Sequence, residues 1–251
     1  MSSIGRSGFN TQSDEIIVNH VETTIPRALA QAVRHFPTTP LLTYYDDASG
    51  DRTELSGATL DNWVSKTANM LLDGVGLAPG DTVAVLMPPH WQTAAILLGV
   101  SAAGLAADLG DRPGPVDALF TTPSGVPAAT GKSTLDRYAT GLLPLAMPLR
   151  SLPDGYQDYV LEVRNYGDHF GGAPVGPDDA AVLSRADVRA AELGISAGDR
   201  VLVDAGAYPD PTDWLFAPLV AGASIVLCTN LDPAKLPARA DTEKATVTLT
   251  P

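Results

Sequence analysis

A ten-residue segment occurs twice in this chain and constrains its fold more than any other feature. The first copy reads LAPGDTVAVL at residues 77–86, and the second reads ISAGDRVLVD at residues 195–204. In each copy an Ala-Gly pair begins 22 residues after the aspartate, at Ala103 and at Ala221. A Gly-Asp turn followed by an apolar run is typical of the entry into a buried strand. Two copies at matched spacing predict two α/β subdomains built on one plan.

Helix and strand patterns alternate along the rest of the chain. Apolar residues at helical spacing predict helices that begin after the capping residues Thr24, Ser56 and Ser184. Residues 41–45 and 52–55 flank a polar turn and predict a hairpin. The other expected strands are apolar runs at residues 82–87, 117–122, 200–204, 224–228 and 245–249. Strands that alternate with helices form parallel sheets, so the predicted fold class is α/β, with two similar subdomains of mostly parallel sheet flanked by helices.

The same patterns divide the chain into four segments. Residues 1–22 are predicted to form a polar N-terminal arm, and residues 23–150 the first α/β subdomain. Residues 151–177 contain loops rich in Gly and Pro and are predicted to form an irregular connection. Residues 178–251 are predicted to form the second α/β subdomain.

The acidic composition excludes several classes of partner. The formal net charge is −13 and the pI is about 4.5, which makes a surface that repels phosphate backbones and anionic membranes. The most apolar stretch, residues 93–109, is too short to span a bilayer. Residues 1–19 lack the apolar core of a secretory signal. We therefore expect a cytoplasmic protein with no nucleic-acid or membrane partner.

The repeated segments and their surroundings carry a family resemblance. The first region contains RTEL at residues 52–55, GLAPGDTVAVLMPPHW at residues 76–91 and AGL at residues 103–105. The second contains DRVLV at residues 199–203 and FAPLVAGASIVL at residues 216–227. Both regions resemble the front part of the adenylate-forming enzymes, the family of acyl-CoA synthetases, luciferases and peptide-synthetase adenylation domains. The resemblance implies the front architecture of these enzymes, with a ligand cleft between the subdomains.

The resemblance does not extend to the parts that perform adenylation. In the family, a Ser/Thr/Gly-rich loop with a lysine wraps the ATP phosphates and is followed by a helix. Residues 182–188, VLSRADV, resemble the entry of that helix. The preceding residues 171–181, GGAPVGPDDAA, contain no Ser, Thr or Lys. The family's adenine segment, ribose aspartate and C-terminal lysine domain do not occur before Pro251. The resemblance therefore implies a truncated relative, similar to short actinobacterial proteins of unassigned function.

The densest polar cluster is RNYGDHFGG at residues 164–172. An aspartate beside a histidine, with an arginine nearby, is a candidate ligand site formed by Arg164, Asp168 and His169. The alternative interpretation is a helix end with a favourable cation, followed by a surface loop. We identify no catalytic residue, no metal site and no cofactor.

Other patterns have structural explanations. GVPAATGKS at residues 125–133 departs from the P-loop spacing and is expected to be a flexible surface loop. Asp204, Asp210 and Asp213 match no known cation loop, and helix capping by Asp210 or Asp213 is the better explanation. Cys228 lies in an apolar run and is expected to be an inert core thiol. The histidines His20, His35 and His90 have no visible partner, and the tryptophans Trp63, Trp91 and Trp214 are expected to lie in the core.

Three hypotheses of function follow. The first is a catalytically incomplete homologue of the adenylate-forming enzymes that binds a small acyl-like or nucleotide-like ligand or a protein partner. The second is an AMP-dependent ligase that a partner chain completes. The third is an assembly protein whose cleft is filled by side chains. The lack of the phosphate loop favours the first and argues against an enzyme.

Overall fold

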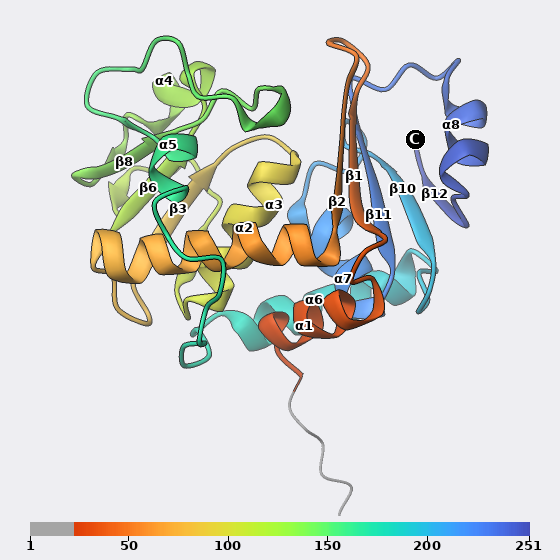
Figure 1. Cartoon of the computed structure of the whole chain (residues 1–251), viewed down its shortest axis with the longest axis horizontal. Coiled ribbons are helices and arrows are strands. Elements are labelled where there is room, and N and C mark those ends of the chain that lie inside the picture. The colour runs from red at the N-terminus through yellow and green to blue at the C-terminus, as the bar shows by residue number, and fades with distance from the viewer. Residues whose placement is uncertain (1–22) are drawn as a thin grey trace, which may run out of the picture.

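The computed structural model describes residues 23–251, so the predicted arm and His20 lie outside the described residues. Two five-stranded sheets stand apart with helices between and below them (Figure 1). The first sheet contains β1 (Pro40–Asp46), β2 (Asp51–Ser56), β10 (Arg200–Asp204), β11 (Ser224–Thr229) and β12 (Val247–Leu249). The second contains β3 (Thr82–Leu86), β4 (Ala106–Asp108), β6 (Ala118–Thr121), β8 (Asp136–Ala139) and β9 (Gln157–Asp158).

Strand pairing confirms the predicted α/β class. The second sheet has the order β4-β3-β6-β8-β9, and all of its pairs are parallel. In the first sheet, of order β12-β10-β11-β1-β2, only the predicted hairpin β1–β2 is antiparallel. The two short strands β5 (Gly114–Pro115) and β7 (Lys132–Ser133) form a small separate sheet.

The sheets do not follow the predicted division of the chain at residues 151–177. Strand β1 pairs in parallel with β11, so a hairpin from the first predicted subdomain completes the sheet of the second. Strand β11 is buried along most of its length and would otherwise present an unpaired edge. Leu41 and Leu42 of β1 are almost fully buried and extend the apolar sheet there. Such a long-range pairing leaves no local mark in the sequence.

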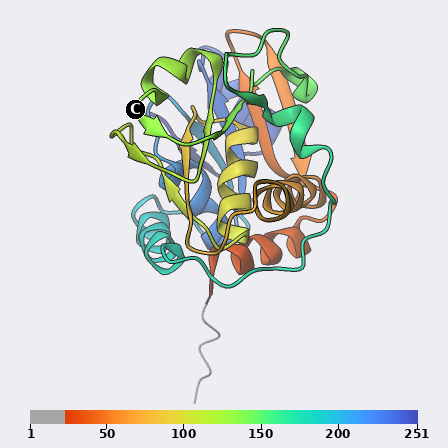
Figure 2. The same cartoon turned by 90° about the vertical axis from the view of Figure 1, so that its left-hand side faces the viewer.

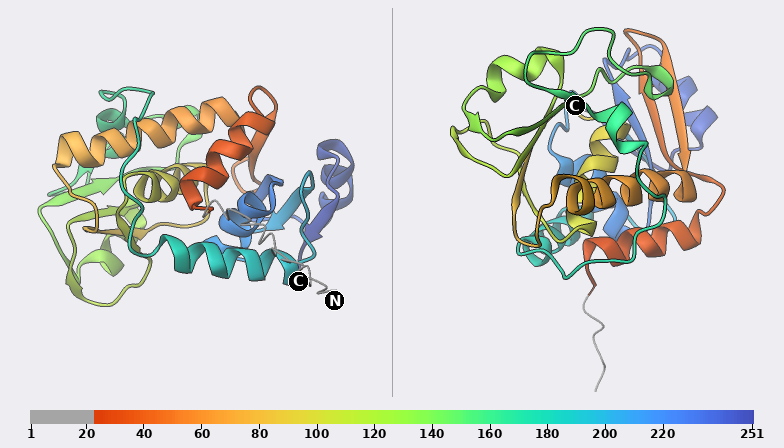
Figure 3. Two further views of the ribbon diagram at one scale, coloured as in Figure 1. Left: turned by 90° about the horizontal axis from the view of Figure 1, so that it is seen from below. Right: turned by 60° about the vertical axis from the view of Figure 1, so that its left-hand side comes forward.

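Helices fill the space between the sheets. Figure 1 shows α2 (Gly57–Asn69) and α3 (Trp91–Ala102) between them, with α8 (Leu236–Glu243) on the outer face of the first sheet. Helices α1 (Ile25–His35) and α6 (Asp179–Glu192) lie below, as the view from beneath shows (Figure 3). Helix α2 continues into the π-helical turn η1 (Met70–Val75), and the π-helical turn η4 (Thr212–Phe216) leads into α7 (Ala217–Ala221).

Two of the three predicted caps are confirmed. Thr24 Oγ1 accepts a hydrogen bond from the Arg27 amide at 3.2 Å, and Ser56 Oγ accepts one from the Thr59 amide at 3.2 Å. The prediction for Ser184 is wrong, because α6 begins at Asp179 and encloses this serine within its second turn. Asp179 instead contacts the start of α1, a tertiary bond that moves the helix start upstream.

The two copies of the repeated segment have matching backbone geometry. Gly80 N donates to the Gly104 carbonyl at 2.9 Å, and Gly198 N donates to the Gly222 carbonyl at 3.0 Å. All four glycines have a positive φ, between 72° and 98°, a region that other residues enter only with strain. The glycines of the repeat are therefore required by two turns that meet at the amino edge of each sheet.

The repeated aspartates make the same bonds in both copies. Asp81 Oδ2 accepts from the Ala78 amide at 2.8 Å, and Asp199 Oδ2 accepts from the Ser196 amide at 2.7 Å. The backbone carbonyl of Asp81 accepts from the amide of Ala106 at the start of β4, and that of Asp199 accepts from the amide of Ser224 at the start of β11. Each aspartate thus closes a turn and fixes the register of the next strand.

Candidate functional site

Two cavities lie between the two repeats. One, of about 270 Å³, is bounded by α3 and β4 on one side and by α6 and η4 on the other. The second, of about 160 Å³, lies between the end of β3 and the segment that follows β10. Leu97 and Leu109 line both cavities, so the two are adjacent, and together they are here called the inter-repeat passage.

The inter-repeat passage follows one face of α3. Thr93, Leu97 and Ser101 are spaced four residues apart and therefore lie on one side of this helix, and Pro89 lies just before its amino end. The second repeat supplies the facing wall, and its apolar members are Val182, Trp214 and Phe216. Polar and charged residues also line the larger cavity: Ser101, Asp178, Asp179, Arg185 and Thr212.

One buried carboxylate lies at the carboxyl end of α3. Asp179 is 6% exposed, and its Oδ1 accepts from the Ile25 amide at 3.1 Å and from Ser101 Oγ at 3.2 Å. Burial raises the pKa of this carboxyl group, and the two hydrogen bonds oppose that shift. Asp179 thus connects the starts of α1 and α6 to α3. The exposed side chain of Arg185 lines the same cavity and adds a positive charge there.

The amino end of α3 carries three buried donors without partners. His90 Nδ1 accepts from the Gln92 amide at 3.1 Å, which caps the helix and leaves the proton of the neutral ring on Nε2. Burial lowers the pKa of His90 to about 3, so the ring stays neutral. Within residues 23–251, His90 Nε2, Trp91 Nε1 and Gln92 Nε2 have no hydrogen-bond partner. His90 is the N-cap of α3, and the residue is 1% exposed.

The segment that joins β8 to β9 covers this end of the space between the sheets. Figure 2 shows it crossing from the second sheet toward the β1–β2 hairpin. Three of its residues other than glycine, Leu142, Leu145 and Ala146, have φ between 50° and 56°, a strained backbone. Arg164 of the following segment donates from Nη2 to the Ala146 carbonyl at 2.8 Å.

The structure separates the three residues predicted to form a ligand site. Arg164 is exposed and bonded to Ala146, and Asp168 is exposed, while His169 lines a different cavity of about 490 Å³ between α1 and α2. Asn69 Nδ2 holds the loop there by donating to the His169 carbonyl at 2.9 Å. No hydrogen bond or ion pair joins Arg164, Asp168 and His169 within the described part of the chain, and a ligand role for His169 stays a prediction.

Sequence reasoning missed the residues that share a cavity with His169. Asp61 and Ser65 of α2 line the same cavity, about a hundred positions before it in the chain. Their only local signal is the spacing of four, which places both on one helix face. That signal is common in surface helices and says nothing about which loop will face it.

The other sequence candidates have structural roles. Lys132 is 3% exposed and pairs with Asp108 at 2.6 Å, and residues 125–133 form a short helix and strand rather than the expected flexible loop. Asp204 and Asp210 accept from backbone amides two residues ahead, and Asp213 pairs with Arg189 at 2.6 Å. Among residues 23–251, no group of three or more His, Cys, Asp or Glu side chains could hold a metal ion.

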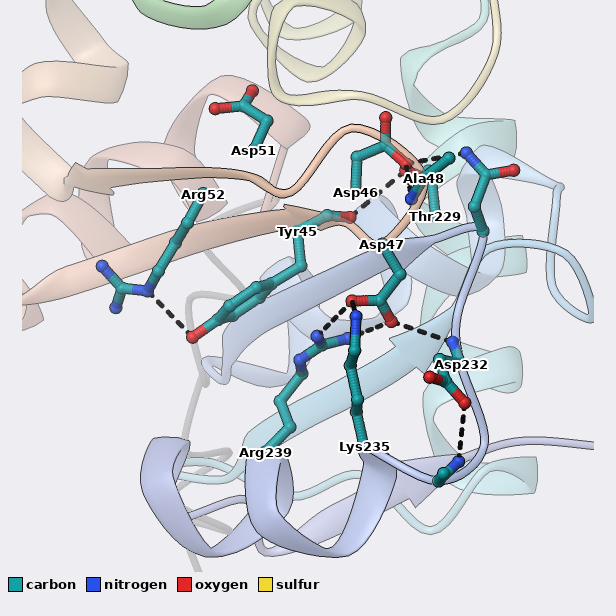
Figure 4. A network of polar contacts seen from close by, with 12 residues as sticks. Tyr45, Asp46, Asp47, Ala48, Asp51, Arg52, Thr229, Asp232, Lys235 and Arg239 are labelled. Atoms are coloured by element: carbon teal, nitrogen blue, oxygen red, sulfur yellow. Dashed lines mark hydrogen bonds and ion pairs between the residues drawn. The ribbon is translucent and has the colours of Figure 1, made fainter.

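A polar network ties α8 to the turn of the β1–β2 hairpin (Figure 4). Both oxygens of Asp47 accept from the guanidinium of Arg239, at 2.6 Å and 3.0 Å, and Lys235 adds an ion pair at 3.2 Å. The Arg239 guanidinium lies 4.2 Å from the centre of the Tyr45 ring. Every charge in this group has a partner, so the network anchors a helix and leaves no group for a ligand.

The segment at the expected position of a phosphate loop lies at the amino edge of the sheets. Gly104 precedes β4, whose Ala106 pairs with the first residue of β3. A side chain at Gly104 would come within 2.2 Å of the Pro174 carbonyl, and one at Gly176 would meet the Gly104 backbone at 3.1 Å. Pro174 and Gly176 therefore pack against the turn of the first repeat, whereas open α/β sheets bind ligands at their carboxyl edges.

Comparison with known proteins supports the resemblance seen in the sequence. Residues 29–108 match the AMP-binding enzyme family. The "TIGR03089 family protein" of Mycobacterium tuberculosis is 40% identical over 241 residues, which cover 89% of this chain and 98% of that protein. The relative is thus matched along almost its whole length.

Solved structures of adenylate-forming enzymes share the fold. The anthranilate CoA ligase AuaEII in complex with anthranoyl-AMP has a TM-score of 0.65 at 14% identity, and an acyl-CoA synthetase of Brucella canis has 0.65 at 16%. The N-terminal domain of FACL13 from M. tuberculosis has 0.62 at 15%. The matches cover 90%, 88% and 90% of this chain but only 49%, 46% and 62% of those chains. This chain therefore corresponds to part of an N-terminal domain.

None of the helices within residues 23–251 is long and apolar enough to cross a membrane.

Proposed function

Because the chain belongs to the TIGR03089 family, a group of relatives of the AMP-binding enzymes, we propose that it binds a small acyl-like ligand and does not form adenylates. The observation that carries this proposal is the inter-repeat passage, whose two cavities share Leu97 and Leu109. Small-molecule sites are typically concave, mainly apolar and equipped with few polar groups. The passage has an apolar stretch that includes Leu97, Leu109 and Phe216, has polar groups around Asp179, and lies between the two repeats.

Charge along the passage favours one orientation of the ligand. The amino end of α3, beside Pro89 and Thr93, carries a partial positive charge that favours a carboxylate or an acyl carbonyl. Asp179 at the other end would repel an anion. We therefore place the head group near Thr93 and the apolar tail between Leu97 and Phe216.

The second half of the proposal, the absence of adenylation, is supported by two observations. Residues 171–181 contain no Ser, Thr or Lys, and Pro174 within them packs against the turn at Gly104. The Gly-Lys-Ser sequence elsewhere in the chain offers no substitute, because Lys132 is buried in its pair with Asp108. A backbone cradle for phosphates ahead of a helix thus has no counterpart in either segment.

Binding of a carboxylate series tests the first half. Straight-chain carboxylates from butanoate to dodecanoate are titrated by calorimetry and by thermal shift, since a ligand that favours the native state raises the melting temperature. Ala107 is exposed on the edge strand β4 and lines the passage, so Ala107→Trp should fill it and abolish binding. Leu161→Trp, an exposed position on α5 (Tyr159–Val163), is the matched control and should bind normally. The proposal fails if no chain length binds or if Ala107→Trp binds as tightly as the wild type.

Pyrophosphate release tests the second half. The purified chain is incubated with ATP, Mg²⁺ and the carboxylates that bind, and pyrophosphate is measured with a coupled assay. We expect no release above the rate without protein. Sustained release by the purified chain alone would overturn the non-adenylating assignment while leaving the binding result intact.

A further inference from the structure

A third space lies outside the inter-repeat passage. Its volume is about 490 Å³, and it is bounded by α1, by α2 and by the segment of residues 169–175. Ser101 is the one residue that lines both this cavity and the passage. Gly171 and Gly172 border open space, since nothing lies within 4 Å of a side chain placed there. The cavity is therefore a distinct space with room at its rim.

Helix α2 presents two polar side chains to this cavity that have no partner. Asp61 and Ser65 lie one helical turn apart on the same face. Ser65 is 6% exposed, and neither its hydroxyl nor the Asp61 carboxylate makes a hydrogen bond within residues 23–251. Both side chains line the cavity with acceptor oxygens that no group in residues 23–251 occupies, so the pair is suited to a ligand that donates hydrogen bonds.

The other polar groups on the wall are already engaged. Thr24 accepts from the Arg27 amide at 3.2 Å, and Ser101 donates to Asp179 at 3.2 Å. The guanidinium of Arg27 is a cation on the α1 side of the cavity. His169 lies on the third wall, and its charge interacts with the Asp61 carboxylate, whose pKa is raised by burial and lowered by the histidine.

We propose that this cavity binds a small organic primary amine as its ammonium ion. An ammonium group has three donors and no acceptor, which matches the Asp61 carboxylate and the Ser65 hydroxyl. The apolar part of the ligand would contact Leu29 and Phe170 on the same wall. The net charge of −13 attracts cations to the protein as a whole.

Calorimetry with benzylamine and its neutral analogue benzyl alcohol tests the proposal. At constant ionic strength, benzylamine should bind saturably at millimolar concentration, and benzyl alcohol should bind at least tenfold more weakly because charge-assisted hydrogen bonds are the stronger ones. In NMR spectra, the imidazole signals of His169 should shift during the benzylamine titration. Equal affinity for both compounds, or no binding of benzylamine, would contradict the site.

Matched variants separate this site from general charge attraction. Asp61→Asn and Ser65→Ala should each weaken benzylamine binding, by about tenfold or more for the charged group. Asp168→Asn removes the same charge from an exposed position beside His169 and should leave binding unchanged. If Asp168→Asn weakens binding as much as Asp61→Asn, the amine follows the protein's field and the site is refuted. Carboxylate binding in the passage is measured on the same variants and should persist, so the two proposals fail separately.

Discussion

The repeated segment offers an internal comparison of two glycines that differ in one contact. Gly104 and Gly222 end the corresponding helices of the two repeats with φ of 72° and 79°. A methyl group at Gly222 would meet the Ala197 Cβ at 3.7 Å, an ordinary contact, whereas one at Gly104 would lie 2.2 Å from the Pro174 carbonyl oxygen. Substitution by alanine therefore tests the backbone strain alone at one site and the strain plus a clash at the other.

The expected costs follow from these contacts. The left-handed conformation costs a residue other than glycine about 1–2 kcal/mol, so Gly222→Ala should lower the free energy of unfolding by that amount. Gly104→Ala carries the same strain and must also displace the segment around Pro174, which adds about 1–3 kcal/mol, typical of an overpacked site. The difference between the two variants measures how firmly residues 171–178 are packed against the first repeat.

Urea denaturation of the wild type and both variants, followed by circular dichroism, gives the two free-energy changes. Limited proteolysis within residues 171–178 supplies a second readout, and faster cleavage is expected in Gly104→Ala alone. Equal destabilisation with equal cleavage would show that the segment moves aside freely. The structural argument that this segment cannot serve as a phosphate loop at the carboxyl edge would then lose its basis.

Three further predictions concern buried ionisable groups. Asp47→Asn should destabilise the protein by about 3–5 kcal/mol because it leaves the buried Arg239 unpaired. Arg239 holds the Asp47 pKa below its usual range, so this stabilisation is present above about pH 3.9 and is lost as the pH falls through the lower folded pKa. Urea titrations of Asp47→Asn and of the wild type should therefore converge in acid. The folded pKa of His90, about 3, lies below the unfolded value of about 6.5, so the free energy of unfolding should decrease as the pH is lowered from about 6.5 to about 3. His90→Asn retains a capping side chain and should make that decrease smaller in the same titrations. Cys228 is fully buried with a pKa raised to about 11, so a thiol reagent should label it only after unfolding; labelling of the native protein would contradict this.

Local patterns predicted most of the secondary structure. The hairpin, the caps at Thr24 and Ser56, and the strands of both repeats appear where apolar periodicity and turn residues place them. The start of α6 did not follow the pattern, because the contact of Asp179 with Ile25 outweighs the capping preference of Ser184. Tertiary contacts of this kind override local propensity wherever the two compete.

The candidate sites were less accessible to sequence reasoning. Asp168 and His169 are neighbours in the chain, yet His169 faces the cavity that Asp61 lines, and Asp168 is exposed. Adjacent residues in a loop point in different directions, so their proximity in sequence carries little information about a shared site. The inter-repeat passage likewise combines Leu97 of α3 with Phe216 of η4, which only the packing of the two repeats brings together.

The repeated unit and its turns are readable from local sequence, because a Gly-Asp turn, a buried strand and a second glycine follow from local sterics and apolar spacing. The kinship with adenylate-forming enzymes is readable in the same way, since those residues form the scaffold that the family shares. Three features depend on long-range packing: β1 completes the sheet of the second repeat, Pro174 and Gly176 pack at the amino edge, and particular side chains face each cavity. These outcomes depend on contacts between residues far apart in the chain, where burial rather than local preference selects the arrangement.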